Sequence, residues 1–580
     1  MSRGGVPGEK IKEDRLSWIA LLLLFAFHVI NNMVIIFQDS TPFIADASDY
    51  YKISFFYWKG WMDFINSGDF YFLHSILRTG NGGQLAALLA IPFFSVFGVS
   101  HDVAILANQA FFLILLLSIF GLGKILWGRT TGLLAAFIIS FYLGVVGFSR
   151  VYMLEFPILA ISTACVYLLI KSEGFKNFKY SLCFGFVLAM GELLRPRFVV
   201  YIVVPVLFYV IKNIVILLRR TEVLASISVK KIAINILTSA VLSCLILLPW
   251  YPMDKISEYF RIQILWSTWP ALSKIGPTLP HYLQMLWEVN LGWFFTFLFF
   301  LGLAISLFEK NKRPKIYFLL VWIALTLILV AMFGLKNFFR LEIPLLAPMA
   351  LISAAGMEGL SKRKIGKYLV VAFLILGIFQ YFFISYGNQF VDGKEERQRL
   401  EEISLSRGLL QAARHDWSLD ELMSTFEERR NSNKEWDWRF INANRIYLMG
   451  GSFRPLTDDL IKVLNADLRG SLINNEMEER ILIGGLPIVV MGLYTDQFNC
   501  NILFSDKELQ HIVLGADYVM RYKAKWPEGS FIDKILDIFD ANISRFEKLK
   551  IVETPRGEIS IYGRKKEDAS GGHPMTGATL

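Results

Sequence analysis

Charged residues are scarce in this sequence. Asp, Glu, Lys and Arg make up 19% of its 580 residues, while 54% are hydrophobic; a typical soluble domain is about 25% charged. This balance excludes a disordered chain and an ordinary cytosolic enzyme. Apolar runs of roughly 17–25 residues recur along the chain, and such runs are long enough to cross a bilayer as helices. The composition therefore indicates a polytopic membrane protein.

Cysteine is scarce as well. Three of the four cysteines, Cys165, Cys183 and Cys244, lie inside apolar runs and leave Cys500 alone in the polar C-terminal part. This pattern excludes a disulfide scaffold, and the chain has no CxxC motif or Cys/His cluster that would indicate zinc.

Basic residues lie mainly in short loops between the apolar runs, and this predicts the orientation. Short loops rich in Lys and Arg face the cytoplasm. The basic segments are the N-terminus and the loops 124–129, 171–179, 219–231, 310–315 and 362–367. Placing all of them inside requires eleven crossings, at residues 17–37, 102–123, 130–148, 156–171, 181–194, 198–218, 232–250, 291–308, 316–334, 343–358 and 368–386.

The remaining segments then fall outside the cytoplasm. The apolar stretch Leu85–Val99 is predicted as a short re-entrant or surface helix, because a crossing there would invert every later loop. Residues 38–83 and 251–290 form external loops. The predicted domains are a membrane domain (1–386), an extracytoplasmic α/β domain (387–564) and a disordered tail (565–580).

The C-terminal part has the patterns of a small α/β domain. Arg445–Met449 and Ile481–Val490 are predicted strands. Leu456–Leu468 and Ile532–Phe546 are predicted amphipathic helices, and Lys548–Arg564 is predicted as a hairpin.

Charged side chains gather at the external ends of the predicted helices. Four segments that are distant in sequence contribute them: Asp46 and Asp49; Arg150 and Glu155; Glu192, Arg195 and Arg197; Lys336, Arg340 and Glu342. A transporter would carry such charges nearer the midplane of the membrane. The pattern instead favours a site at the outer membrane–water boundary.

Five motifs in these segments resemble the GT-C fold, polyprenyl-phosphate-dependent glycosyltransferases, the superfamily of the lipid A aminoarabinose transferase and the protein O-mannosyltransferases. Together they cover about residues 40–350 in the family's order. They are IADASDYYKIS (44–54), SRVYMLEFP (149–157), the helix end from Gly185 to Pro196, PWY (249–251) and KNFFRLEIP (336–344). Two positions depart from the family pattern: Ala47 stands where many relatives have Glu, and Glu155 where most have Asp.

The resemblance implies an inverting glycosyltransferase whose donor is a sugar linked to a polyprenyl phosphate. Asp46 would be the catalytic base, and Glu155 would assist it or position the acceptor. The donor phosphate would be bound by four basic residues: Arg195, Arg197, Lys336 and Arg340. Supporting roles fall to four further residues: Asp49, Tyr50, Arg150 and Glu192.

The chemistry of the transfer agrees with these residue types. A carboxylate can take the proton of an attacking hydroxyl, and Arg or Lys can stabilise the charge of the leaving phosphate without a metal. No cofactor is expected, since no DxD-type metal motif occurs in the predicted site. The expected partners are the lipid donor and a lipid, glycan or protein acceptor, in a bacterial cell membrane.

Other interpretations remain open at this stage. Asp46 is suited to capping a helix that starts at Ala47, and Glu155 is favoured at any helix start by the dipole. Arg195 and Arg197 can simply extend to lipid headgroups. The alternative functions are a polysaccharide polymerase or ligase that uses a pyrophosphate-linked glycan, and a transporter or flippase with an external domain.

Overall fold

The structure is a computed structural model, and it describes residues 7–38, 46–68, 82–218, 222–251, 272–332, 340–386, 446–449, 518–522, 537–554 and 557–565. The chain forms two compact units. The membrane unit contains residues 1–39 and 53–413, and the C-terminal unit contains residues 40–52 and 414–580.

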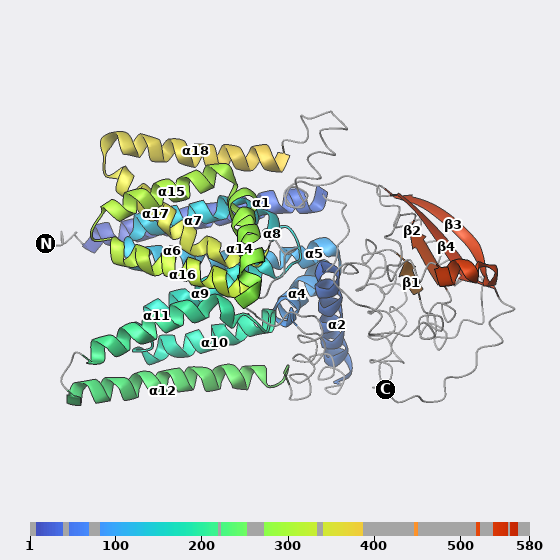
Figure 1. The fold of residues 1–580 in the computed structure, drawn as a ribbon, viewed down its shortest axis with the longest axis horizontal. Coiled ribbons are helices and arrows are strands. Elements are labelled where there is room, and N and C mark those ends of the chain that lie inside the picture. The colour runs from blue at the N-terminus through green and yellow to red at the C-terminus, as the bar shows by residue number, and fades with distance from the viewer. Residues whose placement is uncertain are drawn as a thin grey trace. The chain divides into compact units, whose positions relative to one another are not determined.

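Long helices make up the membrane unit and lie side by side along one axis (Figure 1). They are α1 (Pro7–Gln38), α6 (Asn108–Trp127), α7 (Arg129–Phe141), α9 (Glu155–Lys171), α10 (Phe178–Leu194), α11 (Val199–Leu218), α12 (Glu222–Leu247), α15 (Gly292–Phe308), α16 (Arg313–Met332), α17 (Leu346–Ser361) and α18 (Lys364–Tyr386). Shorter elements connect them: α2 (Asp46–Ser67), α4 (Gln84–Phe97), α5 (His101–Leu106), α8 (Leu143–Ser149), η1 (Leu272–Lys274), α14 (Ile275–Gln284), the π-helix η2 (Met285–Leu291) and η3 (Ile343–Leu345).

The predicted helical membrane fold is confirmed, and every predicted span overlaps one of the long helices. Among the described residues, seven segments are long and apolar enough to cross a membrane, or eight if α7 and α8 count as one span bent by 64°. Helices α9 and α10 have 17 residues each, about 25 Å at 1.5 Å per residue, which is near the lower limit for a span. The number eleven stays a prediction.

Helix α4 occupies the apolar stretch predicted as a short element. It has 14 residues, about 21 Å, and it lies with α5 and α8 at one end of the bundle (Figure 1). Gly83 (φ 85°) and Gly98 (φ 83°) bound it, and both have a positive φ that glycine adopts without strain. The two glycines thus determine where this helix begins and where it ends.

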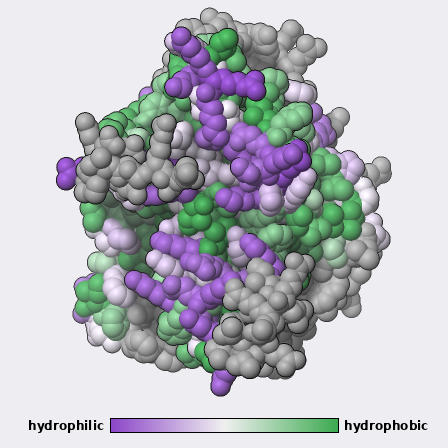
Figure 2. Space-filling view, turned by 90° about the vertical axis from the view of Figure 1, so that its left-hand side faces the viewer, coloured by the Kyte–Doolittle hydropathy of each residue, from purple (hydrophilic) through white to green (hydrophobic). Residues whose placement is uncertain are grey.

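Basic side chains collect at the opposite end of the bundle, which we call the basic end. Helices α6, α9, α11, α15 and α17 finish there. Figure 2 looks at this end and shows hydrophilic residues across its middle. The exposed basic residues of these loops are Lys124, Lys179, Lys230, Lys231, Lys310, Lys362, Arg363, Lys364 and Lys367.

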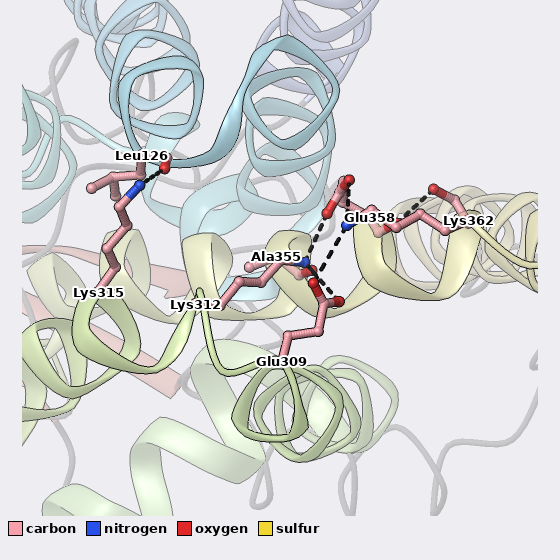
Figure 3. A network of polar contacts seen from close by, with 8 residues as sticks. Leu126, Glu309, Lys312, Lys315, Ala355, Glu358 and Lys362 are labelled. Atoms are coloured by element: carbon pink, nitrogen blue, oxygen red, sulfur yellow. Dashed lines mark hydrogen bonds and ion pairs between the residues drawn. The ribbon is translucent and has the colours of Figure 1, made fainter. Parts of the chain in front are cut away.

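One lysine of the basic end is buried and connects three helices (Figure 3). Lys312 Nζ lies 3.1 Å from Glu309 Oε1 and 2.7 Å from Glu358 Oε2. It also donates a hydrogen bond of 2.6 Å to the carbonyl oxygen of Ala355. Lys362 pairs with Glu358 at 3.2 Å. Two lysines and two glutamates thus form a balanced cluster that joins α15 and α16 to α17.

The described part of the C-terminal unit contains a four-stranded sheet in the order β1-β2-β4-β3. Its strands are β1 (Ile446–Met449), β2 (Tyr518–Tyr522), β3 (Phe546–Thr554) and β4 (Gly557–Arg564). β1 and β2 are parallel, and the other pairs are antiparallel. Phe539 packs against Phe546 and Tyr562, with ring centroids 5.2 and 5.1 Å apart.

The predicted strand 445–449 and hairpin 548–564 are present as β1 and as β3–β4. Of the predicted helix Ile532–Phe546, the described part is helical over residues 537–541 and then turns into η7 (Ile543–Arg545). The predicted strand 481–490, helix 456–468 and tail from residue 566 lie outside the described residues.

Close packing of α15 on α17 depends on glycine. A Cβ atom added at Gly356 would lie 2.2 Å from the Cα of Gly302, and one added at Gly302 would lie 2.7 Å from the Cα of Ser353. Small residues of this kind let membrane helices approach closely.

We therefore expect Gly356→Ala to lower the free energy of unfolding by about 1–3 kcal/mol, because the added methyl group meets backbone and must push the helices apart. Gly276→Ala in α14 is the matched control, since a Cβ there has nothing within 4 Å. Thermal unfolding in detergent measures the stability of both variants. Equal midpoints for the two variants would contradict the assignment.

Candidate functional site

Glu155 is the first residue of α9 and is buried, with a relative exposure of 1%. An acid is favoured in this position because the free N–H groups of the first turn carry partial positive charge. Pro157 is tolerated two residues later, since its missing N–H would have no partner within the helix. The local sequence thus starts α9 with a carboxylate.

Two arginines from other helices flank this carboxylate. Arg195 Nη2 donates a hydrogen bond of 2.8 Å to Glu155 Oε1, and Arg340 Nε lies 3.4 Å from the same oxygen. The side chains of Arg195 and Arg340 are only 18% and 9% exposed. We call Arg195, Glu155 and Arg340 the Arg–Glu–Arg triad.

Prolines position both arginines. Pro196 excludes the helical conformation at Arg195, so α10 ends there with extended backbone (φ −154°, ψ 126°). Arg340 comes shortly before the helical segment η3–α17, whose second residue is Pro344. Arg340 Nη1 also lies 3.8 Å from Met153 Sδ, just ahead of Glu155.

A second buried acid, Glu342, lies beside the triad. It is 0% exposed, and Asn290 Nδ2 donates a hydrogen bond of 2.9 Å to its Oε1. Burial raises the pKa of Glu342 to about 8; hydrogen bonds from its own backbone N–H and from Asn290 oppose this rise, and the charge of Glu155 adds to it. Glu342 is therefore mostly neutral at pH 7.

Asn290 is placed by unusual backbone. It lies in the π-helix η2, a rare form that is frequently found at functional sites. A Cβ at Gly144 of α8 would lie 2.3 Å from Asn290 Oδ1, so this approach requires glycine. From sequence, Glu342 is only a charge at a helix end and Asn290 is not predicted at all, because a π-helix has no recognisable sequence pattern.

The motifs that are separate in sequence meet in the structure. Ser54 of the first motif and Tyr152 of the second share a buried hydrogen bond of 2.7 Å. Tyr251 of the PWY motif donates to the carbonyl oxygen of Glu192 at 3.2 Å. The triad joins the second, third and fifth motifs. All five motifs thus connect at the start of α9 or at the end of α10.

Three of the residues predicted for the site have neighbours outside the triad: Arg150, Glu192 and Arg197. Arg150 is buried and donates to Asn32 Oδ1 (2.9 Å), Tyr381 OH (2.8 Å) and Ser385 Oγ (3.1 Å), so it holds α18 against α1. Glu192 Oε1 accepts the Val199 N–H at 3.0 Å, at the start of α11.

Arg197 is half-buried and lies near Lys274 of η1. The pKa of Lys274 is lowered by burial and then by this guanidinium.

The remaining predicted residues belong to α2 or to a segment outside the described residues. Asp46 is the first residue of α2, and Asp49 and Tyr50 follow in the same helix. Tyr50 is half-buried. The side chains of Asp46 and Asp49, and the whole of Lys336, are outside the described residues. Among those that are described, no three His, Cys, Asp or Glu side chains are grouped so that they could hold a metal ion.

Comparisons with known proteins bear on the fold. The family model for dolichyl-phosphate-mannose-protein mannosyltransferases matches residues 83–246. ArnT from Cupriavidus metallidurans bound to undecaprenyl phosphate aligns with a TM-score of 0.51 at 10% identity, over 94% of this chain and 98% of ArnT. Its apo state aligns with a TM-score of 0.55 at 9% identity, over 97% and 100%.

A third solved structure comes from an archaeon. The oligosaccharyltransferase AglB from Archaeoglobus fulgidus, in complex with an inhibitory peptide and a dolichol-phosphate, aligns with a TM-score of 0.51 at 12% identity, over 96% of this chain and 75% of AglB. By sequence, no curated protein matches. The resemblance to the GT-C glycosyltransferases that the motifs predicted is thus confirmed, and the chain has their fold.

The triad makes a prediction about stability. Glu155→Gln keeps the shape of the side chain but leaves two buried guanidinium groups without their anion, so we expect the free energy of unfolding to fall by about 3–5 kcal/mol. In the double variant with Arg195→Gln, a coupling energy of about 1–3 kcal/mol should appear. Unfolding in mixed micelles measures this coupling energy.

Lys310→Gln is the control for this cycle, because Lys310 is exposed at the basic end. Its combination with Glu155→Gln should be additive. Additivity of Glu155→Gln with Arg195→Gln as well would mean that the ion pair contributes nothing.

Proposed function

We propose that the chain is an inverting membrane glycosyltransferase, which transfers a sugar from a polyprenyl-phosphate donor to an acceptor hydroxyl. The observation that carries the proposal is the buried Arg–Glu–Arg triad, which is assembled from three of the family-like motifs. The mannosyltransferase model match spans Glu155 and Arg195, and the solved relatives bound to undecaprenyl phosphate and dolichol-phosphate support a lipid-linked phosphate as donor.

In this reaction the acceptor oxygen attacks the anomeric carbon from the face opposite the phosphate. The bond between that carbon and the phosphate oxygen breaks, and its electron pair stays on the lipid phosphate. The proton of the acceptor hydroxyl passes to a carboxylate. A guanidinium can bind the leaving phosphate through two parallel N–H groups, and it stabilises charge that develops in the transition state.

Glu155 is suited to positioning the arginines rather than to accepting the proton. One of its oxygens lies between Arg195 and Arg340, at 2.8 and 3.4 Å. A carboxylate held in this way orients both guanidinium groups and lowers the reorganisation needed when the phosphate becomes more negative. The extra methylene of Glu, compared with the family's usual Asp, gives it the reach to contact both.

Because Glu155 positions the arginines, we assign the role of catalytic base to Asp46. Asp46, Tyr50 and Ser54 are spaced by four residues along α2 and therefore share a face of this helix. Ser54 bonds to Tyr152 in the turn before Glu155. Ser54 belongs to the membrane unit, so the end of the first motif contacts the second motif there, whereas Asp46 belongs to the C-terminal unit.

The site faces away from the cytoplasm in this proposal. Glu155 and Lys171 are the two ends of α9, about 24 Å apart at 1.5 Å per residue, and Lys171 belongs to a basic loop. The positive-inside rule places basic loops in the cytoplasm. The donor would thus be used at the outer leaflet of a bacterial cell membrane, with the C-terminal unit on the same side and no metal assigned to the reaction.

The base can be tested with Asp46→Asn, which keeps the shape and removes the proton acceptor. We expect turnover to fall by about 10²–10⁴-fold, while donor binding changes little. Transfer from a polyprenyl-phosphate sugar by the purified protein in detergent is the measurement. Asp63→Asn, in the same helix, is the control and should keep normal turnover. Near-normal turnover of Asp46→Asn would refute the role of base.

The phosphate contact can be tested with Arg340→Lys and Arg340→Ala. Lys keeps the charge but lacks the planar fork, so it should lose turnover nearly as strongly as Ala if Arg340 grips the leaving phosphate. The loss should fall on kcat more than on donor affinity, because the contact strengthens as the bond breaks. If Arg340→Lys retains full turnover at saturating donor, Arg340 acts only as a positive charge.

A further inference from the structure

We propose that Asn108 is a positioning residue for the phosphate-binding arginines. Its buried carboxamide holds the turn between α8 and α9, and through this turn it fixes where Glu155 meets Arg195 and Arg340. The inference rests on the proposed function and adds to it a residue that lies in none of the five motifs.

The turn between α8 and α9 determines where Glu155 lies. It comprises residues 150–154, which belong to neither helix. Ser, Thr, Asp and Asn are preferred just before a helix, because their side chains accept hydrogen bonds from its first N–H groups. The residue before α9 is Leu154, whose side chain cannot do this. The start of α9 is therefore fixed by contacts other than a cap.

Asn108, the first residue of α6, makes such contacts with the backbone of the turn. Its Nδ2 donates a hydrogen bond of 2.8 Å to the carbonyl oxygen of Val151 and one of 3.5 Å to that of Ser149. A single side-chain amide thus joins the last residue of α8 to the turn that follows it. Asn108 is buried, so its removal would leave these carbonyl oxygens without this donor in a place that water does not readily reach.

The next turn of α6 contacts α9 itself. Phe112 comes four residues after Asn108 and therefore lies on the same face of α6. Its ring stacks on that of Phe156, with centroids 5.8 Å apart, and both rings are buried. Phe156 directly follows Glu155. One face of α6 thus holds the backbone before Glu155 and the side chain after it.

The contacts of Glu155 allow little movement of its backbone. One oxygen of its carboxylate lies 2.8 Å from Arg195 and 3.4 Å from Arg340, and hydrogen bonds weaken steeply when their distance or angle changes. A turn that is released from Asn108 would shift this carboxylate. The guanidinium groups would then no longer be held in the orientation in which they receive the lipid phosphate.

The experiment replaces Asn108 with Leu, which has a similar size and cannot donate a hydrogen bond. The measurement is the Kd of undecaprenyl phosphate for the full chain in detergent. We expect Asn108→Leu to raise this Kd roughly 10–100-fold, which corresponds to the loss of about one hydrogen bond to a charged group. Thermal unfolding establishes that each variant is folded at the temperature of the assay.

Asn235→Leu is the matched control. Asn235 of α12 is also buried, and its Nδ2 donates a hydrogen bond of 2.7 Å to the carbonyl oxygen of Phe175, in the loop that follows α9. The same kind of bond is thus made at the other end of α9. Its loss should lower the unfolding temperature as in Asn108→Leu, while the Kd stays close to that of the unmodified protein. If Asn108→Leu does not fold, Asn108→Ala removes the same donor, and Asn235→Ala becomes its control.

Glu155→Asp tests whether Asn108 acts through Glu155. Asp keeps the charge but is one methylene shorter, so it no longer reaches both arginines, and the exact place of its backbone matters less. Residues that act through one contact have non-additive effects. In the Glu155→Asp background, Asn108→Leu should therefore raise the Kd by less than about threefold.

The outcomes separate this inference from the proposed function. The same Kd for folded Asn108→Leu and Asn235→Leu would mean that Asn108 is merely structural. An undiminished effect of Asn108→Leu in the Glu155→Asp background would mean that it does not act through Glu155. Either result overturns the role of Asn108, while binding by the unmodified protein leaves the proposed function standing. If the folded, unmodified protein binds no undecaprenyl phosphate, the proposed function fails and this inference fails with it.

Discussion

Removing the carboxylate of Glu155 from water has a free-energy cost that charged, hydrogen-bonded partners can offset. Those partners come from the end of α10 and from the segment before η3. Because the guanidinium groups must reach one buried oxygen, they constrain where α10 ends and where η3–α17 begins relative to α9. The packing of this end of the bundle and its chemistry therefore depend on the same contact.

The two ends of the membrane unit use buried charge differently. At the basic end, Lys312 and Lys362 are matched by Glu309 and Glu358, and a balanced cluster has no excess charge to offer a ligand. At the other end, two arginines face one carboxylate, with a second acid kept neutral by burial. The first cluster joins helices through matched lysines and glutamates, whereas the second gathers two guanidinium groups at one buried carboxylate.

Several glycines and prolines shape the site without touching it. Pro196 stops α10 at Arg195, and Gly144 leaves room for the Asn290 side chain. Gly185, part of the family-like third motif, instead allows α12 to approach, since a Cβ there would lie 2.4 Å from the carbonyl oxygen of Ser239. A motif glycine can thus serve packing, while the charged residue at the end of the same motif serves the site.

Much of this protein is determined by local sequence. Apolar runs determine the helical membrane unit, because a backbone in lipid must satisfy its own hydrogen bonds. Proline and glycine determine where α4, α10 and α17 begin or end. The alternation in the C-terminal part predicted β1 and the β3–β4 hairpin, whereas β2 went unpredicted, since it pairs with strands distant in sequence. The motifs identified Glu155, Arg195 and Arg340 as residues of one site.

Only the tertiary structure decided which of the charged residues meet. From sequence, Arg150 and Glu155 belong to the same motif, yet Arg150 turns toward Asn32 and Tyr381 while Glu155 turns toward Arg195 and Arg340. They are five positions apart, which is enough for a helix end and a turn to direct them to different neighbours. The protonation of Glu342 is likewise invisible in sequence. It arises from burial and from Asn290 and Glu155, and these lie 52 and 187 positions away along the chain. Residue type and local pattern are properties of the sequence, whereas the electrostatic environment of a side chain is a property of what folding brings beside it.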